Sequence, residues 1–154
     1  MKKKYDDCLV LIPARGGSKG IPKKNIKLFN NLPLILHTTR IAIEIFNKKN
    51  IIVSTDSNEI RKVVENDKLN VPFLRPNELA KDESGIREVI LHAINYYESK
   101  NKNKIKKIIL LQPTSPLRDK QDIINALSIY DNGEYDMVSS VKETKSNPYF
   151  VLYE

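Results

Sequence analysis

Short apolar runs alternate with longer amphipathic stretches along the whole chain. The apolar runs predict strands at about 8–13, 50–55, 71–74, 106–112 and 136–141. The amphipathic stretches have hydrophobic residues at helical spacing and predict helices at about 34–47, 57–67, 85–99 and 120–131. A repeated strand–helix order is typical of a mostly parallel sheet covered by helices. This order restricts the fold to the α/β class.

Two of the apolar runs indicate strands that are buried on both faces. Neither Ile51-Ile52-Val53 nor the segment 108–111 shows the polar alternation of a half-exposed strand. Continuous apolar strands are expected where helices cover both faces of a parallel sheet. We therefore predict a three-layer α/β fold with a mostly parallel sheet and a Rossmann-like nucleotide-binding topology.

Capping residues support two of the predicted helices. Asp56 and Glu59 have the spacing of a capping box at the start of the helix 57–67, and Asp119 precedes the helix that begins near residue 120. Asp56 is also a candidate metal ligand. Its position in the capping pattern favours the structural role.

A glycine-rich, basic loop follows the first predicted strand. Three of the five glycines lie within Gly16-Gly17-Ser18-Lys19-Gly20. Glycines permit left-handed backbone angles, so successive N–H groups can converge on phosphate oxygens. Arg15, Lys19, Lys23 and Lys24 add positive charge. We predict a nucleotide triphosphate as the ligand; the alternative is an ordinary glycine turn on a lysine-rich surface.

The spacing within this loop excludes two common phosphate motifs. The sequence contains neither the Walker A glycine pair followed by Lys-Ser/Thr nor a G-x-G-x-x-G pattern at this position. Pro22 lacks an N–H and disfavours a helical conformation at Ile21. We therefore expect an extended chain through Lys23-Lys24-Asn25 that wraps the ligand without running straight into a helix.

Length and composition indicate a soluble protein of one domain. The chain has 154 residues, of which 40% are hydrophobic, enough to form a substantial core. The only cysteine, Cys8, lies in an expected buried strand, which argues against an internal disulfide or a metal cluster. No apolar stretch has membrane-spanning length, and the first residues do not form a signal peptide. We expect a cytoplasmic protein with no membrane partner.

The net charge of +7 raises the question of nucleic-acid binding. Many lysines lie at expected loop and helix ends, where solvated surface explains them. Three of the arginines follow predicted strands: Arg15, Arg75 and Arg118. A planar guanidinium matches phosphate or base edges better than an ammonium does, so this pattern indicates a compact anionic ligand. The sequence lacks the aromatic–basic interleaving that stacks single-stranded bases, so nucleic-acid binding is the weaker hypothesis.

Several of these features are expected at one edge of the sheet. In parallel sheets, ligands bind at the carboxyl ends of the strands. The glycine loop, Ser54-Thr55-Asp56, Arg75 and Gln112-Pro113-Thr114-Ser115 each follow a predicted strand. We therefore expect them to surround a common site.

Four segments, in order, carry a family resemblance. They are 11–25, with the sequence LIPARGGSKGIPKKN; 53–57, VSTDS; 74–80, LRPNELA; and 111–118, LQPTSPLR. Together they resemble the acylneuraminate cytidylyltransferases, also called CMP-sialic acid synthetases. The related CMP-KDO synthetases share the fold but carry an acidic segment in place of 112–115, so that branch ranks lower.

The resemblance implies an activity as well as a fold. The fold would be that of the nucleotide-diphospho-sugar transferases, and the reaction would move CMP from CTP to a nonulosonic acid with release of pyrophosphate. Mg²⁺ or Mn²⁺ would assist by neutralising charge. The full-length form would be a homodimer. The alternative function is a nucleotide-binding module without transfer activity.

Residue roles follow from matched positions in the resemblance. Arg15 and Lys24 would be catalytic by neutralising the triphosphate, Asn25 would face the ribose or base, and Gln112 and Ser115 would contact the sugar. Ser115 lies between two prolines, so shaping the turn is its alternative role. The resemblance implies ten nucleotide-binding residues: Ala14, Arg15, Gly16, Gly17, Ser18, Lys24, Asn25, Arg75, Ser84 and Gln112.

The sequence also departs from the family pattern. Ile86 stands where some members have a serine near the cytosine, and no Asp-x-Asp triplet of the kind that binds the metal occurs. We therefore expect no metal ligands in this chain and place them in a missing C-terminal part. Because the chain stops at Glu154 in an apolar segment, we expect the N-terminal part of a longer enzyme or a naturally short form. N-acetylneuraminic, legionaminic and pseudaminic acids all remain candidate acceptors.

Overall fold

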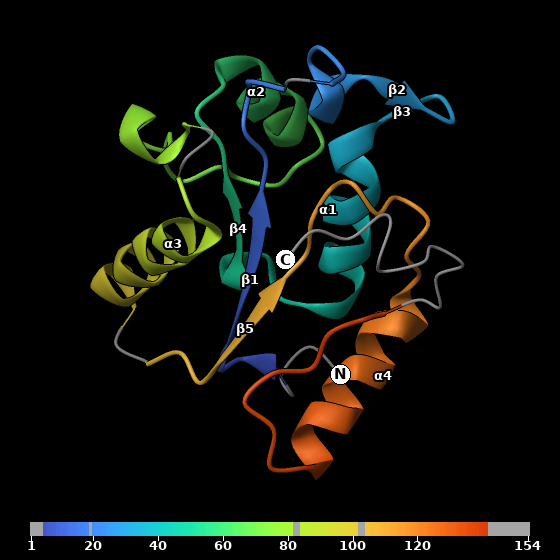
Figure 1. Cartoon of the computed structure of the whole chain (residues 1–154), viewed down its shortest axis with the longest axis vertical. Helices are drawn as coiled ribbons and strands as arrows, with labels where there is room; N and C mark the ends of the chain where they lie inside the picture. The colour runs from blue at the N-terminus through green and yellow to red at the C-terminus, as the bar shows by residue number, and fades with distance from the viewer. Residues whose placement is uncertain (1–4, 19, 82–83, 102–103, 142–154) are drawn as a thin grey trace, which may run out of the picture. The chain divides into compact units, whose positions relative to one another are not determined.

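The computed structural model describes residues 5–18, 20–81, 84–101 and 104–141 (Figure 1). The chain divides into two compact units, 1–118 and 119–154. The first unit contains the sheet and the glycine loop. The described residues of the second unit, 119–141, contain one helix, α4 (Lys120–Asn132).

A three-stranded parallel sheet forms the centre of the first unit. Its strands are β1 (Cys8–Pro13), β4 (Ile51–Ser54) and β5 (Lys107–Leu110), in the spatial order β4-β1-β5. Val10 lies opposite Ile51 on one side and Ile109 on the other. β1 and β4 are buried along almost their whole length, whereas β5 is only partly buried. The expected parallel sheet is confirmed.

The four predicted helices are present, with ends that lie within two residues of the expected positions. Besides α4, they are α1 (Leu34–Ile45), α2 (Asn58–Asn66) and α3 (Ile86–Lys100). A short antiparallel hairpin of β2 (Leu28–Phe29) and β3 (Leu32–Pro33) precedes α1.

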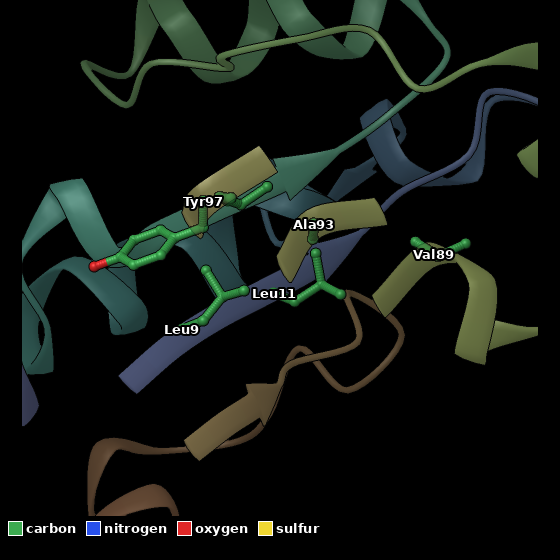
Figure 2. Packing of buried hydrophobic residues seen from close by; sticks show 6 residues of the cluster. Leu9, Leu11, Val89, Ala93 and Tyr97 are labelled. Carbon is green, nitrogen blue, oxygen red and sulfur yellow. The ribbon is translucent and has the colours of Figure 1, made fainter. Parts of the chain in front are cut away.

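Helices cover both faces of the sheet within the first unit. Figure 2 shows Val89, Ala93 and Tyr97 of α3 packed against Leu9 and Leu11 of β1. Because side chains alternate along a strand, Val10, which lies between these two leucines, points to the opposite face, where α1 contacts β1 (Figure 1). The first five residues of β1 are fully buried. This arrangement confirms the three-layer α/β class.

Two predicted strands do not form. The segment 71–74 is irregular: Val71 is buried, but Leu74 is 38% exposed. The next residue, Arg75, donates its backbone N–H to the Thr55 carbonyl at 2.7 Å, so the chain crosses the end of β4 instead of pairing alongside it. The described residues of 136–141 contain no strand either, and Val141 is 93% exposed.

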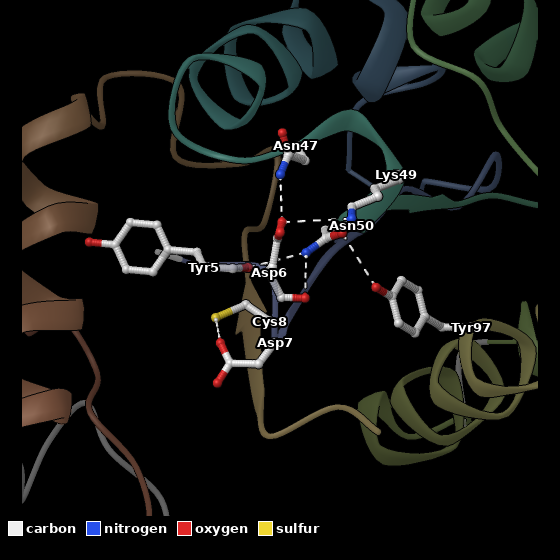
Figure 3. A network of polar contacts seen from close by, with 8 residues as sticks. All are labelled: Tyr5, Asp6, Asp7, Cys8, Asn47, Lys49, Asn50 and Tyr97. Carbon is white, nitrogen blue, oxygen red and sulfur yellow. Dashed lines mark hydrogen bonds and ion pairs between the residues drawn. The ribbon is translucent and has the colours of Figure 1, made fainter. Parts of the chain in front are cut away.

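A buried polar network joins the chain before β1 to the start of β4 (Figure 3). Nδ2 of the fully buried Asn50 donates to the carbonyls of Tyr5 and Asp6, both at 3.1 Å. The Tyr97 hydroxyl donates to Asn50 Oδ1 at 3.3 Å. Burial raises the pKa of Tyr97, and the nearby charge of Asp6 adds to this effect. The network lies at the amino ends of the strands, opposite the glycine loop, and therefore stabilises the fold.

Candidate functional site

A cavity of about 290 Å³ opens beside the glycine loop, and all its lining residues belong to the first unit. Four cationic side chains line it: Arg15, Lys24, Arg75 and Lys81. The remaining lining residues are polar or apolar: Pro13, Gly17, Ser18, Asn25, Leu79, Ser84, Ile86, Val89, Gln112, Pro113 and Thr114. Most of the lining residues come from the segment after β1, the segment that leads into α3 and the segment after β5. These segments meet at the carboxyl edge of the parallel sheet, where ligands are expected.

The structure brings most of the expected nucleotide-binding residues together in this cavity. The exceptions are Ala14 and Gly16. Ala14 is fully buried and its N–H donates to the Ser54 carbonyl at 2.9 Å, so it continues the contact between β1 and β4. The expected sugar-binding residue Ser115 is exposed and does not line the cavity; its N–H donates to the Gln112 carbonyl at 3.4 Å, consistent with a role in the turn.

The glycine loop achieves its shape differently from the sequence-based expectation. None of the described glycines has a positive φ, whereas Lys23 does, with φ of 52°. The left-handed turn at Lys23 leads into a short 3-10 helix, η2 (Lys24–Ile26). The expectation of an extended chain through Lys23-Lys24-Asn25 is therefore wrong.

Gly16 allows the loop to approach α2 closely. A Cβ atom at Gly16 would lie 2.9 Å from Ser57 Cβ, closer than side chains normally pack. A Cβ at Gly17 or Gly20 would meet nothing within 4 Å. The glycine is needed at position 16 for contact with the helix start, not for a left-handed angle.

Asp56 lies between the glycine loop and Arg75. Its Oδ1 accepts a hydrogen bond from the Gly16 N–H at 2.8 Å and lies 3.7 Å from Arg75 Nη2. The N-cap of α2 is Ser57, whose Oγ accepts from the Ile60 N–H at 3.4 Å. The prediction of Asp56 as the cap is therefore wrong by one residue, because its carboxylate is engaged by the loop. The capping role of Asp119 is confirmed, with Asp122 completing a capping box.

Arg75 combines deep burial with unpaired donors. The residue is 6% exposed, and its Nε and Nη2 have no hydrogen-bond partner among the described residues. Burial lowers the pKa of Arg75, and the positive charge of Arg15 lowers it further, while Asp56 opposes both. An arginine still remains charged at neutral pH. A buried charge with open N–H donors is costly unless a ligand satisfies it, so the site favours an anion.

Three other predicted residues have partners within the site. Asn25 is 7% exposed and donates from Nδ2 to the Arg15 carbonyl at 2.9 Å. The Ser84 hydroxyl donates to the Glu78 carbonyl at 2.7 Å and keeps its acceptor capacity. The exposed Gln112 accepts from the Thr114 hydroxyl at 3.5 Å.

Sequence reasoning missed Lys81 as a residue of the cavity. Lys81 is one of many lysines, and composition does not distinguish it from solvated surface. Its one distinguishing signal is its position directly after the segment 74–80, which carries the family resemblance. Thr114 lies inside the segment 112–115, already expected at the sheet edge.

The described residues do not fit a protein-held divalent cation. No group of three or more His, Cys, Asp or Glu side chains capable of holding a metal occurs among them. The described residues that line the cavity include no carboxylate. Hard cations such as Mg²⁺ prefer carboxylate and other oxygen ligands. Within the same described ranges, no helix has the length and apolar character needed to cross a membrane.

Comparison with curated proteins finds several relatives that are more than 30% identical to this chain. N-acylneuraminate cytidylyltransferase of Escherichia coli O18:K1:H7 is 38% identical over 140 residues, covering 90% of this chain and 32% of the relative. The protein of the same name from Streptococcus agalactiae serotype V is 36% identical over 142 residues, covering 91% and 33%. CMP-N,N'-diacetyllegionaminic acid synthase of Legionella pneumophila is 37% identical over 122 residues, covering 79% and 52%. The chain thus spans between about a third and a half of these relatives' length.

Solved structures support the fold. A CMP:2-keto-3-deoxy-manno-octonic acid synthetase in complex with CTP matches with a TM-score of 0.61 at 23% identity, covering 81% of this chain and 48% of that protein. A cytidylyltransferase from Leptospira borgpetersenii matches with a TM-score of 0.54 at 22% identity, covering 82% and 50%. Both confirm the nucleotide-diphospho-sugar transferase type of fold.

A family model covers almost the whole chain. The model described as cytidylyltransferase matches residues 9–150, a range that contains all four segments of the resemblance. The resemblance is thereby confirmed: the chain belongs to the cytidylyltransferase family.

Proposed function

We propose that this protein binds CTP in the cavity beside the glycine loop and transfers CMP to a nonulosonic acid, with release of pyrophosphate. The observation that carries the proposal is the buried Arg75, whose Nε and Nη2 lack hydrogen-bond partners among the described residues. Arg15 and Lys24 line the same cavity. Three cations around one space match a triphosphate better than a neutral ligand.

The proposed reaction joins two anions, so its main barrier includes charge repulsion. The anomeric hydroxyl of the sugar loses its proton to the solvent, and its oxygen forms a bond to the α-phosphorus. The bond between the α-phosphorus and the oxygen that bridges to the β-phosphorus breaks, and pyrophosphate leaves with that oxygen. Arg15 and Lys24 neutralise the phosphates and hold them for in-line attack, so positioning and electrostatic stabilisation do most of the work. We therefore propose them as the catalytic residues of this chain.

The walls of the cavity provide surfaces for the rest of the nucleotide. Leu79 and Val89 offer apolar contact to a base, and Asn25 and Gln112 offer amide groups to the ribose, base or sugar. Ser84 contributes an acceptor oxygen. Preference for cytidine is supported by the names of the curated relatives, which make CMP-linked acids.

The proposed function includes a metal cofactor, an oligomeric state and a cellular compartment. We propose Mg²⁺ or Mn²⁺ as the cofactor, with ligands outside the described residues, because those residues do not supply a metal site. We also propose a homodimer and a cytoplasmic location, following the family resemblance. Nucleic acid is not a proposed partner.

The transfer activity is tested by product formation. The protein is incubated with CTP, Mg²⁺ and N-acetylneuraminic, legionaminic or pseudaminic acid, and CMP-linked products are measured by mass spectrometry. The expected result is one CMP-linked acid and an equal amount of pyrophosphate. Tight CTP binding without product from any acceptor would instead support the second candidate, a nucleotide-binding module without transfer activity. The described residues contain no metal-binding cluster, and this observation supports the nucleotide-binding module as a second candidate function.

A further inference from the structure

We propose that Asp56 is a positioning residue of the nucleotide site. Its carboxylate holds the glycine loop and the Arg75 guanidinium in the relative arrangement that receives the triphosphate. Asp56 does not line the cavity, so it acts through Gly16 and Arg75 rather than on the ligand. The inference rests on the proposed nucleotide-binding function. It states that one side chain, Asp56, holds the glycine loop and Arg75 in position.

The contact with the loop is the first support. Gly16 and Asp56 are 40 residues apart in the sequence, yet the Gly16 N–H donates to Asp56 Oδ1 at 2.8 Å. A charge-assisted bond of this length is among the stronger hydrogen bonds in proteins. The Cβ position of Gly16 lies 2.9 Å from Ser57 Cβ, so the loop is pressed against the residues that follow β4. The loop conformation therefore depends on this carboxylate.

The contact with Arg75 is the second support. Asp56 Oδ1 lies 3.7 Å from Arg75 Nη2, near enough for an ion pair but outside hydrogen-bond distance. Arg75 Nε and Nη2 therefore keep N–H donors that have no hydrogen-bond partner among the described residues. The Arg75 backbone is held separately by the Thr55 carbonyl at 2.7 Å. Asp56 offsets the buried charge of Arg75 without occupying its donors.

The positioning role and simple electrostatics predict opposite changes in CTP affinity when the Asp56 side chain is removed. A carboxylate close to a triphosphate repels it, so removing the negative charge of Asp56 would strengthen CTP binding if charge alone mattered. If Asp56 positions Gly16 and Arg75, removing the side chain weakens CTP binding instead. The two accounts are separated by one titration.

The experiment compares three variants of the chain by calorimetric titration with CTP. Asp56→Ala removes both contacts, and its CTP affinity is expected to fall about tenfold. Asp56→Asn keeps an oxygen that accepts from the Gly16 N–H, and its affinity is expected to stay within about threefold of the wild type. The matched control is Glu59→Gln, which removes one negative charge from an exposed pair with Lys23 and is expected to change affinity less than about twofold. An Asp56→Ala protein that binds CTP as tightly as the wild type, or more tightly, overturns the proposal.

A second measurement needs no ligand and separates this inference from the proposed function. Hydrogen exchange of the Gly16 amide, followed by NMR, is expected to be slow in the wild type and in Asp56→Asn and fast in Asp56→Ala. Unchanged exchange in Asp56→Ala refutes the positioning role even if CTP binds. If the wild type does not bind CTP, the proposed function fails, while the Gly16 amide still decides whether Asp56 holds the loop. Asp56→Ser, whose side chain is too short for both contacts, replaces Asp56→Ala if the latter does not fold.

Discussion

The side-chain amide of Asn25 donates a hydrogen bond of 2.9 Å to the backbone carbonyl of Arg15, joining the two ends of the glycine loop. Asn25 is 7% exposed, so this bond is shielded from competition by water. Both residues line the cavity. The two ends of the loop are thus held together by residues of the chain itself, which lowers the ordering cost of binding.

The close approach at Gly16 predicts that substitution by alanine destabilises the protein more at Gly16 than at Gly20, in the same loop. Gly16→Ala places a Cβ 2.9 Å from Ser57 Cβ and is expected to reduce the free energy of unfolding by about 1–3 kcal/mol, since neighbouring atoms must shift. Gly20→Ala meets nothing within 4 Å and has no positive φ to strain. Chemical denaturation measures both variants. Equal stability of the two would show that the loop does not press on α2.

CTP binding is expected to require the guanidinium group of Arg75 and not only its positive charge. Arg75→Lys keeps the positive charge but loses the planar fork and the Nε donor, so CTP affinity is expected to fall about tenfold. The control is Arg40→Lys, at an exposed pair with Asp67 in which the arginine lies outside the cavity. That change is expected to leave CTP affinity unaltered. Calorimetric titration gives both affinities, and wild-type binding by Arg75→Lys would contradict the assigned role.

The buried hydroxyl of Tyr97 predicts a pH dependence of stability. Its pKa in the folded protein is raised above the ordinary 10.0. Above that pH the unfolded chain loses a proton that the folded protein retains, so the contribution of Tyr97 is present below pH 10 and lost as the pH rises further.

Tyr97→Phe tests this dependence. The variant loses the bond to Asn50 and is expected to be about 1 kcal/mol less stable at neutral pH. The difference from the wild type is expected to shrink above about pH 10, which urea denaturation at a series of pH values measures. Tyr135→Phe, at an exposed tyrosine, serves as the control. A difference that grows at high pH would contradict the assigned pKa direction.

Magnesium is expected to be dispensable for CTP binding by this chain. Four cations line the cavity and none of the described lining residues is a carboxylate. Because Mg²⁺ neutralises part of the triphosphate charge, it weakens the attraction to these cations. CTP affinity measured in EDTA is therefore expected to equal or exceed the affinity in Mg²⁺ at the same ionic strength. Binding that occurs only with Mg²⁺ would show that a metal site contributes to nucleotide binding.

The layered fold and the position of the site could be predicted because they follow from periodicity and strand order. A continuous apolar strand such as Ile51-Ile52-Val53 is stable where helices cover both faces of the sheet, and β4 is buried at every residue. The segment 71–74 shows the limit of that reasoning. This segment is apolar because it packs on the protein, and the backbone bond from Arg75 to Thr55 holds the residue that follows it across the end of β4. An apolar run alone does not distinguish a paired strand from such a crossing segment.

The details within the site were less predictable because they depend on contacts distant in sequence. Asp56 and Ser57 are both good caps, and the choice of Ser57 follows from the Gly16 N–H, 40 residues away, that engages Asp56. The left-handed turn falls on Lys23, a residue type without a preference for that conformation. Local propensity does not contain this information.

Calorimetric titration with CTP, GTP and ATP shows whether the cavity holds a nucleotide site selective for CTP. The expected result is one CTP per chain, with GTP and ATP binding at least about tenfold more weakly. Arg15→Ala serves as the site control and is expected to lose most CTP affinity without unfolding. Equal binding of all three nucleotides, or no binding of CTP, would contradict a CTP-selective site in this cavity.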